Sequence, residues 1–337
     1  MMKKRIVLFF LGMCIAFSTM FVPTAVAAEN IGLYAPTVYN NSLVVTWSQI
    51  SNAQSWNYES KLPESWNYNY YIERSKSANG GYEYIGKTSQ PTFKDDSKDL
   101  IPGKTYYYRI AFMKNNIVQY SNTLAVTLKT ASVTGLSKTS VDNSKAYIKW
   151  NELVNAVRWN YETKLPESWN YYYYIERSKS KTKGFKKIGS TDKVNFVDDS
   201  GDLIPGKTYY YRITGMVNKT TVKSSTITVK IKPIKFKNVR IAKANKKRVV
   251  IKWSQISNAR SWDIKTKTSG RSYGNYVYYV QRSQKVKGGF KTIGGTDGKS
   301  YTDESKFAKG KTYYYRIAVM VNNTIKYSSA VKAKPRS

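Results

Sequence analysis

The residues best suited to acid–base or metal chemistry are three pairs of adjacent carboxylates. Asp95-Asp96, Asp198-Asp199 and Asp303-Glu304 recur at matching places along the chain. Such pairs are typical of calcium ligands or of a catalytic acid–base pair. Each pair ends a short run of β-forming residues, where neighbouring side chains point to opposite faces of a sheet. We therefore interpret the pairs as solvated polar residues at strand ends.

The rest of the composition lacks the commonest catalytic groups. The chain has no histidine, which removes the usual general base near neutral pH. Its single cysteine, Cys14, lies in an N-terminal leader, so no disulfide or thiolate metal site is expected after processing. No phosphate-binding glycine loop, zinc-ligand spacing or nucleophile elbow is present. The sequence predicts a protein that is not an enzyme and uses no metal and no cofactor.

Two segments combine aromatic rings with amides in a pattern typical of recognition surfaces. Residues 55–69 contain the triplet Trp-Asn-Tyr twice, ten residues apart, and residues 158–171 repeat the arrangement. Alternation with polar residues predicts a hairpin of two β-arms, joined at residues 61–64 in the first segment, with its rings on one face. Such rings suit a sugar face or a protein hot spot. The candidate ligand-binding residues are Trp56, Tyr58, Trp66, Tyr68, Trp159, Tyr161, Trp169 and Tyr171.

These segments also have a purely structural interpretation. In it, the hairpin folds back to extend the core, or caps the junction to the next domain. The string Leu-Pro-Glu-Ser-Trp-Asn-Tyr, identical at 62–68 and 165–171, does not decide between the two, because a recent duplication would also produce it. The third copy keeps only Trp262-Asp263-Ile264 and continues as a basic stretch, residues 265–274.

Positive charge increases towards the C-terminus. Residues 28–131 have a net charge of +2, residues 132–232 of +9, and residues 233–337 of +21. The last value exceeds the magnitude of about 2 to 8 that keeps a small domain soluble, which indicates an anionic partner. The candidate polyanion-binding residues are Lys265, Lys267, Arg271, Lys285 and Lys287.

A repeated β-framework must position these segments. The stretch Leu100–Ile110 reappears unchanged as Leu203–Ile213, and a third time as residues 309–317. A Pro-Gly turn enters a run in which Tyr106, Tyr108 and Ile110 share one face, which predicts a turn followed by a strand. Trp47 recurs at a period of 103 residues, as Trp150 and Trp253. A period of this length indicates tandem domains.

The spaced tryptophans, the Tyr-x-Ile/Val-x-Arg-Ser strand at 70–75 and the turn-strand unit resemble fibronectin type III repeats of bacterial secreted or cell-surface proteins. In this resemblance Trp47 lies in strand B, and Tyr106, Tyr209 and Tyr313 occupy the tyrosine-corner position. The third repeat departs from the pattern, because its turn at residues 308–310 has no proline. The resemblance implies an all-β chain of three tandem immunoglobulin-like sandwiches, with the aromatic hairpin inserted between strands B and C.

The expected organisation follows from these patterns. A positively charged N-terminal segment, an apolar run and a cleavage site with small residues at Ala25 and Ala27 predict a signal peptide over residues 1–27. The mature chain is then expected to have no membrane span. The repeats are expected at 28–131, 132–232 and 233–337. The protein is then secreted, extracellular or associated with a cell wall.

Two functions are consistent with this organisation. In the first, a non-catalytic binding or adhesion protein holds an anionic cell-wall or matrix polymer through its third repeat. Its first two repeats then contact a glycan or a protein through their aromatic hairpins. In the second, the chain is a spacer or matrix subunit that self-associates through the hairpins.

Overall fold

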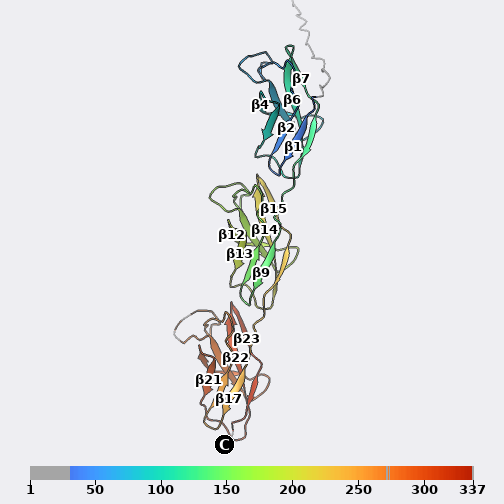
Figure 1. The fold of residues 1–337 in the computed structure, drawn as a ribbon. Coiled ribbons are helices and arrows are strands. Elements are labelled where there is room, and N and C mark those ends of the chain that lie inside the picture. Colours follow the sequence, from blue (N-terminus) through green and yellow to red (C-terminus); the bar gives the residue numbers. More distant parts are fainter. Residues whose placement is uncertain (1–30, 271, 273, 336–337) are drawn as a thin grey trace, which may run out of the picture. The chain divides into compact units, whose positions relative to one another are not determined.

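The computed structural model describes residues 31–270, 272 and 274–335 (Figure 1). The predicted signal peptide and Arg271 lie outside the described residues. The first repeat contains β1 (Tyr34–Val38), β2 (Leu43–Thr46), β3 (Tyr70–Ser75), β4 (Glu83–Thr88), β5 (Thr92–Asp95), β6 (Thr105–Lys114), β7 (Ile117–Tyr120) and β8 (Leu124–Thr127). The second contains β9 (Ser137–Val141), β10 (Ala146–Lys149), β11 (Tyr173–Ser178), β12 (Lys186–Thr191), β13 (Asn195–Asp198), β14 (Thr208–Val217), β15 (Thr220–Lys223) and β16 (Ile227–Lys230). The third contains β17 (Arg240–Ala244), β18 (Val249–Lys252), β19 (Tyr278–Ser283), β20 (Lys291–Thr296), β21 (Ser300–Asp303), β22 (Tyr313–Val321), β23 (Thr324–Tyr327) and β24 (Val331–Ala333).

Each repeat is a sandwich of a three-stranded and a five-stranded sheet. In the first repeat the sheets have the orders β1-β2-β5 and β4-β3-β6-β7, and β8 also pairs with β6. The second and third repeats have the same two orders with their own strands. The predicted fold class, all-β with three tandem immunoglobulin-like sandwiches, is confirmed.

The core of each sandwich forms from the alternation seen in the sequence. Along β6, Tyr106, Tyr108 and Ile110 are buried, while the residues between them are half-buried. The three period-setting tryptophans, of which Trp47 is the first, are buried as predicted. The hydroxyl of Tyr209 donates to the carbonyl of Asp202 at 3.0 Å, seven residues upstream. This bond reproduces the tyrosine corner that the resemblance implied.

A second apolar layer covers the other face of the five-stranded sheet. In the first repeat it contains the buried side chains of Trp56, Tyr71, Ala111 and Met113. Tyr71 and Met113 point away from the sandwich core, because their neighbours along β3 and β6 point into it. The B–C insertion therefore makes this sheet a buried middle layer, and matching clusters occur in the second and third repeats.

The carboxylate pairs are not fully solvated, so that interpretation was wrong. The first member of each pair, Asp95, Asp198 or Asp303, is buried. Asp198 accepts hydrogen bonds from Arg177 at 2.6 Å and from the hydroxyl of Tyr211 at 2.7 Å. A buried carboxylate requires such partners, which here tie the end of one sheet to the other.

Internal contacts divide the chain into two compact units. One comprises the described residues up to Pro36 together with Val44–Phe93 and Tyr106–Val126, which is most of the first repeat. The other comprises Thr37–Leu43, Lys94–Thr105 and everything from Thr127 onwards. The predicted domain boundaries stay predictions. No helix among the described residues has the length and apolar character needed to cross a membrane.

Candidate functional site

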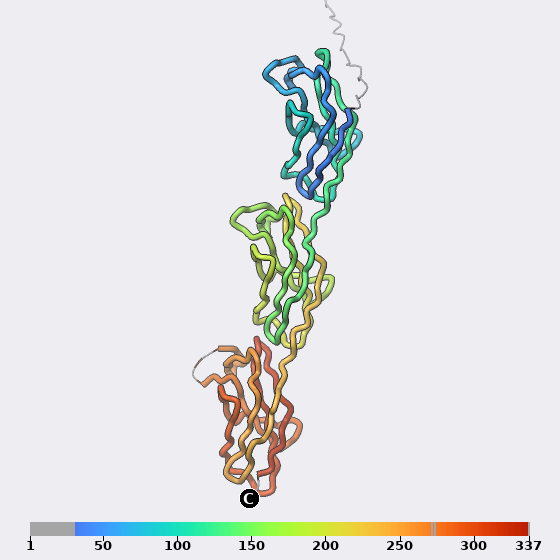
Figure 2. The backbone as a smooth tube through the Cα atoms, viewed as in Figure 1, coloured from blue at the N-terminus to red at the C-terminus, as the bar shows by residue number. Residues whose placement is uncertain are grey.

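The insertion between β2 and β3 is a doubly folded loop rather than the predicted two-armed hairpin (Figure 2). Residues 55–57 pair with residues 62–64, since the N–H of Glu64 donates to Ser55 O at 3.0 Å. The chain then turns again, and Trp56 N–H donates to Tyr68 O at 3.2 Å on the opposite side. The arm that carries Trp56 is therefore the middle of three segments, and the second repeat has the same arrangement around Trp159.

This folding separates the two tryptophans of each loop. Trp56 and Trp159 are completely buried against the five-stranded sheet. The indole Nε1 of Trp56 donates to the carbonyl of Asn69 at 3.2 Å, and its ring packs edge-on against Tyr71 at 4.7 Å. The expectation that these two residues bind a ligand was wrong, because pairing of their segment on both sides places them beneath the loop, against the sheet.

Tyr58 and Tyr161 are also held by their own domains. The hydroxyl of Tyr58 donates to Glu73 Oε1 at 2.5 Å, and that of Tyr161 donates to Glu176 at 2.6 Å. The ammonium group of Lys61 lies 3.7 Å from the centre of the Tyr58 ring. Both tyrosines are half-buried scaffold residues, with little ring area left for a ligand.

Sequence reasoning missed the buried carboxylate at the centre of this arrangement. Glu73 also forms an ion pair with Arg109 at 2.7 Å, and the Arg109 guanidinium lies between the rings of Tyr82 and Tyr120 at 4.3 and 4.2 Å. The third repeat replaces the glutamate with Gln281. The available signal was the run Tyr70-Tyr71-Ile72 at the start of β3, which places apolar residues on both faces of the strand and indicates burial on both faces of the sheet.

The second tryptophan of each loop points into solvent. Trp66 is 83% exposed and Trp169 is 79% exposed. On the same loops Leu62 and Leu165 are exposed, and Tyr68 and Tyr171 are exposed to about 40%. Of the eight predicted ligand-binding residues, Trp66, Tyr68, Trp169 and Tyr171 therefore remain available for contact. We call these two loops the indole loops. Their exposed residues are Leu62, Trp66 and Tyr68 in the first repeat and Leu165, Trp169 and Tyr171 in the second.

A carboxylate holds the turn that carries each exposed indole. Glu64 accepts hydrogen bonds from the amide of Asn57 at 3.2 Å and from the amide of Asn67 at 2.6 Å. The N–H of Asn67 also donates to the carbonyl of Glu64 at 3.1 Å. Trp66 lies inside this closed turn, so its backbone is already ordered before any partner binds. Glu167 makes the same amide contacts in the second repeat.

The half-buried phenols of Tyr58 and Tyr161 predict sensitivity to alkali. Burial, the hydrogen bond from its hydroxyl to Glu73 and the charge of Glu73 raise the pKa of Tyr58 well above its usual value. Burial and the same two interactions with Glu176 raise the pKa of Tyr161. A raised folded-state pKa contributes stability that is complete below the unfolded pKa of about 10 and is lost as pH rises above it. We expect the melting temperature to fall above about pH 10, measured by circular dichroism. The Tyr58→Phe, Tyr161→Phe variant should lose less, and a flat wild-type profile up to pH 12 would contradict this assignment.

The structure separates the candidate basic residues into two groups. Lys265 and Lys267 are exposed in the B–C loop of the third repeat, before β19 begins. Lys285 and Lys287 are exposed in the turn that follows β19, at the opposite end of that strand. Among the described residues none of these four forms an ion pair. The four lysines therefore do not make up one compact site.

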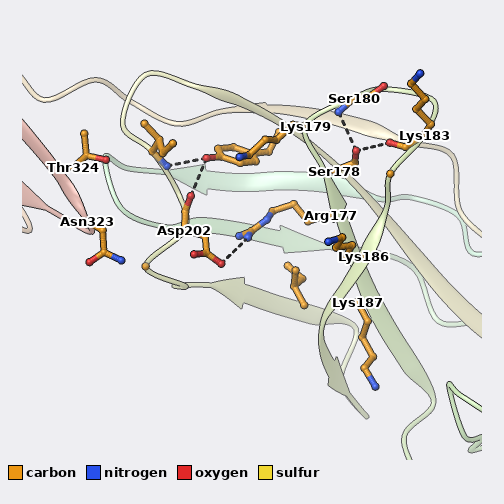
Figure 3. A pocket seen from close by; sticks show the side chains of 15 residues that line it. Arg177, Ser178, Lys179, Ser180, Lys183, Lys186, Lys187, Asp202, Asn323 and Thr324 are labelled. Atoms are coloured by element: carbon orange, nitrogen blue, oxygen red, sulfur yellow. Dashed lines mark hydrogen bonds and ion pairs between the residues drawn. The ribbon is translucent and has the colours of Figure 1, made fainter. Parts of the chain in front are cut away.

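The turn after β19 has a fixed geometry that the second repeat shares. The hydroxyl of Ser283 donates to Gly288 O at 2.8 Å and accepts from Lys285 N–H at 2.9 Å. Figure 3 shows the equivalent turn after β11, where Ser178 donates to Lys183 O at 2.5 Å and accepts from Ser180 N–H. The backbone that carries Lys285 and Lys287 is therefore ordered by these hydrogen bonds.

The acidic residues of the third repeat leave its surface charge largely uncompensated. Asp263 accepts two backbone N–H groups of the following turn, and these bonds lower its pKa. Asp297 accepts a backbone N–H at the end of the B–C loop. Asp303 is buried beside Arg282; although burial opposes it, hydrogen bonding and this cation lower its pKa. Only Glu304 of the four acidic residues is an exposed carboxylate without such a role.

No group of three or more potential metal-ligating side chains occurs within the part of the chain that the structure describes. What these domains offer instead is surface: apolar loops in two repeats and basic side chains in the third.

Comparison with known proteins identifies no family for this chain. No protein-family model and no curated protein matches the sequence. The FN1–FN3 domains of chicken CNTN1 align over 92% of this chain and 99% of theirs, with 11% identity and a TM-score of 0.25. A segment of two fibronectin type III domains from chicken tenascin aligns over 60% of this chain and 99% of its own, with 14% identity and a TM-score of 0.30. The sandwiches of three and five strands are fibronectin type III-like in their fold.

Proposed function

We propose that this chain is a secreted, non-catalytic adhesion protein of a Gram-positive bacterial envelope or matrix. Its indole loops bind a protein partner, and its third repeat attaches to an anionic wall or matrix polymer. The single observation that carries the proposal is the exposure of Trp66 and Trp169 on identical ordered turns. A fold of this class hosts many functions, so the proposal rests on these sites rather than on the architecture.

The exposed indoles have the properties of binding hot spots. Tryptophan combines a large apolar area with few rotatable bonds, and truncation of a hot-spot tryptophan costs about 2 kcal/mol or more of binding energy. The hydrogen bonds from the Asn57 and Asn67 amides to Glu64 order the turn around Trp66, so little additional conformational entropy is lost when a partner binds. Trp56, buried below it, ties the same loop to the sheet.

The polar groups of the loops favour a protein over a glycan as the partner. A sugar presents hydroxyls that need hydrogen-bonding side chains beside the stacked ring. The amides that could supply them, Asn57 and Asn67, are engaged with Glu64. Beside the exposed polar side chains of Glu59, Ser60, Lys61 and Ser65, the loop exposes the mainly apolar groups of Leu62, Trp66 and the Tyr68 ring. They suit an apolar pocket on another protein.

We expect the indole contribution to persist at high salt. At an ionic strength of about 0.5 M the polymer attraction is screened, whereas burial of an indole is not. Binding of the mature protein to purified Gram-positive cell walls should then weaken at least about 30-fold in Trp66→Ala, Trp169→Ala. The matched control Tyr34→Ala, Val197→Ala removes exposed apolar side chains outside the loops.

Protease treatment of the walls distinguishes the partner classes. Loss of the high-salt binding supports a protein partner, whereas survival after protease treatment would identify a glycan. Equal binding by the indole variant and its control would contradict a role for the loops.

Self-association is the second candidate function, because an exposed indole also fits a pocket on a second copy. Sedimentation velocity of the mature protein, from micromolar to high concentration, tests it. Oligomers that disappear in Trp66→Ala, Trp169→Ala would favour the spacer or matrix subunit.

A further inference from the structure

The outer face of the three-stranded sheet in the third repeat places like charges directly opposite each other. β17 pairs with β18 so that Arg240 lies opposite Lys252, and Lys243 lies opposite Val250 in the next outward row. Like charges in direct cross-strand opposition destabilise a sheet. Neither Arg240 nor Lys252 forms an ion pair within the part of the chain that the structure describes. A surface that retains this repulsion is a candidate for a function outside the fold.

The outward direction of these side chains follows from the register. Val249 and Ile251 of β18 are buried, so Lys252 and Val250, which alternate with them, face away from the core. The third strand, β21, contributes Ser300 opposite Lys252. The six outward positions of the sheet are Arg240, Lys243, Val250, Lys252, Ser300 and Thr302, with no acidic and no aromatic member.

The other two repeats show that the scaffold does not need this charge. In the second repeat Lys149 occupies the place of Lys252, but its neighbours are Ser137 and Asn195. In the first repeat two hydroxyls occupy the same row, where Thr46 and Thr92 lie 3.4 Å apart. The opposed pair therefore belongs to the third repeat alone.

Further basic residues extend the face in both directions along the strands. The turn between β17 and β18 is closed by Asn245, whose side chain accepts two backbone N–H groups. From that turn to the far end of β17 the basic stripe is about 20 Å long, given the rise of a β-strand. Glu304, which follows β21, is the acidic residue at its margin. The stripe consists of Arg240, Lys243 and Lys252, and the exposed basic residues that flank these strands in sequence are Lys237, Lys246, Lys247, Arg248 and Lys299.

We propose that this stripe binds a flexible polymer of phosphodiester repeats, of the wall-teichoic-acid type. The inference deepens, and rests on, the proposed attachment through the third repeat. An open sheet face without aromatic side chains offers nothing on which a nucleobase could stack. A flexible chain can follow two rows of cations on neighbouring strands. Lysine and arginine next to phosphates release counterions, so the affinity falls steeply with salt.

The test compares two variants of the full mature chain that lose the same charge. Arg240→Gln, Lys243→Gln, Lys252→Gln neutralises the sheet face, and Lys265→Gln, Lys267→Gln, Lys285→Gln neutralises loop lysines. The probe is labelled poly(glycerol phosphate), titrated by fluorescence anisotropy from 50 to 200 mM salt. The sheet variant should bind about 10- to 100-fold more weakly, with its logarithmic salt slope reduced by about 2 to 3, and the loop variant should change little.

Each outcome bears on a separate claim. Equal losses in the two variants would overturn the sheet face and leave the proposed attachment standing. Unchanged binding in both would overturn the attachment as well. Tighter binding of duplex DNA than of poly(glycerol phosphate) would overturn the polymer class. Because like-charge opposition is removed, the sheet variant should melt no lower than the wild type, which separates lost binding from lost folding.

Discussion

Replacing Trp159 with alanine is expected to destabilise the second repeat by about 3 to 5 kcal/mol, the usual cost of removing a fully buried tryptophan. Its ring packs at 4.8 Å against Tyr174, in a cluster that also contains Met216. Truncation leaves a cavity between the loop and the sheet, and the loop loses its attachment. Hydrogen–deuterium exchange of β11 and β14 in the full chain would report the loss within this repeat.

Trp169→Ala supplies the control, since both residues begin a Trp-Asn-Tyr triplet of the same loop. Trp169 is exposed, so its removal should change the free energy of unfolding by less than about 0.5 kcal/mol. Equal destabilisation by the two variants would mean that the loop does not divide into a buried and an exposed half.

The second large effect is expected at Glu176. This buried carboxylate accepts the hydroxyl of Tyr161 and pairs with Arg212. Glu176→Ala leaves both groups unpaired beneath the loop. Removing one partner of a buried ion pair costs about 3 to 5 kcal/mol. Because the Arg212 side chain is about one-quarter exposed, we expect roughly 2 to 4 kcal/mol in urea unfolding.

The third repeat suggests the matched variant. There Gln281 takes the place of Glu176 and accepts a hydrogen bond from Arg316 at 2.8 Å. Ile264, two residues after the buried Trp262, takes the place of Tyr161. The double change Tyr161→Ile, Glu176→Gln reproduces that pair and should cost less than the sum of its single changes. Strict additivity in this double-mutant cycle would show that the hydroxyl and the carboxylate are not coupled.

The sandwich framework could be predicted because its signals are local. Tyr106, Tyr108 and Ile110 alternate in one strand, and the period of Trp47 marks each domain. The direction of each side chain follows from strand geometry once the strand is recognised.

The folding of the insertion could not be predicted from alternation alone. Trp56 and Trp66 have the same neighbours in sequence, yet one is buried and the other is exposed. The difference arises from backbone pairing. Trp56 lies in the middle of the three paired segments of the loop, against the sheet, and Trp66 lies in the turn that Glu64 holds closed. The apolar outward residues Tyr71 and Met113 were the available sign that something covers this face.

Which basic residues lie together could not be predicted for a similar reason. Lys265 and Lys285 are both exposed, but they lie at opposite ends of β19. Arg240 and Lys252 are twelve residues apart in sequence and become neighbours only through strand pairing. Charge counts point to the third repeat, whereas the register of the sheet determines which of its charges lie together.

The most direct test of the account is the accessibility of the indoles. Of the eight tryptophans, only Trp66 and Trp169 are exposed, so acrylamide should quench a fraction of the fluorescence that is absent from Trp66→Ala, Trp169→Ala. Adding the soluble protein fraction of Gram-positive cell walls in about 0.5 M salt should protect that fraction in the wild type, because the partner covers both indoles. Quenching that stays unchanged while the proteins are bound would show that the indole loops are not the contact surface.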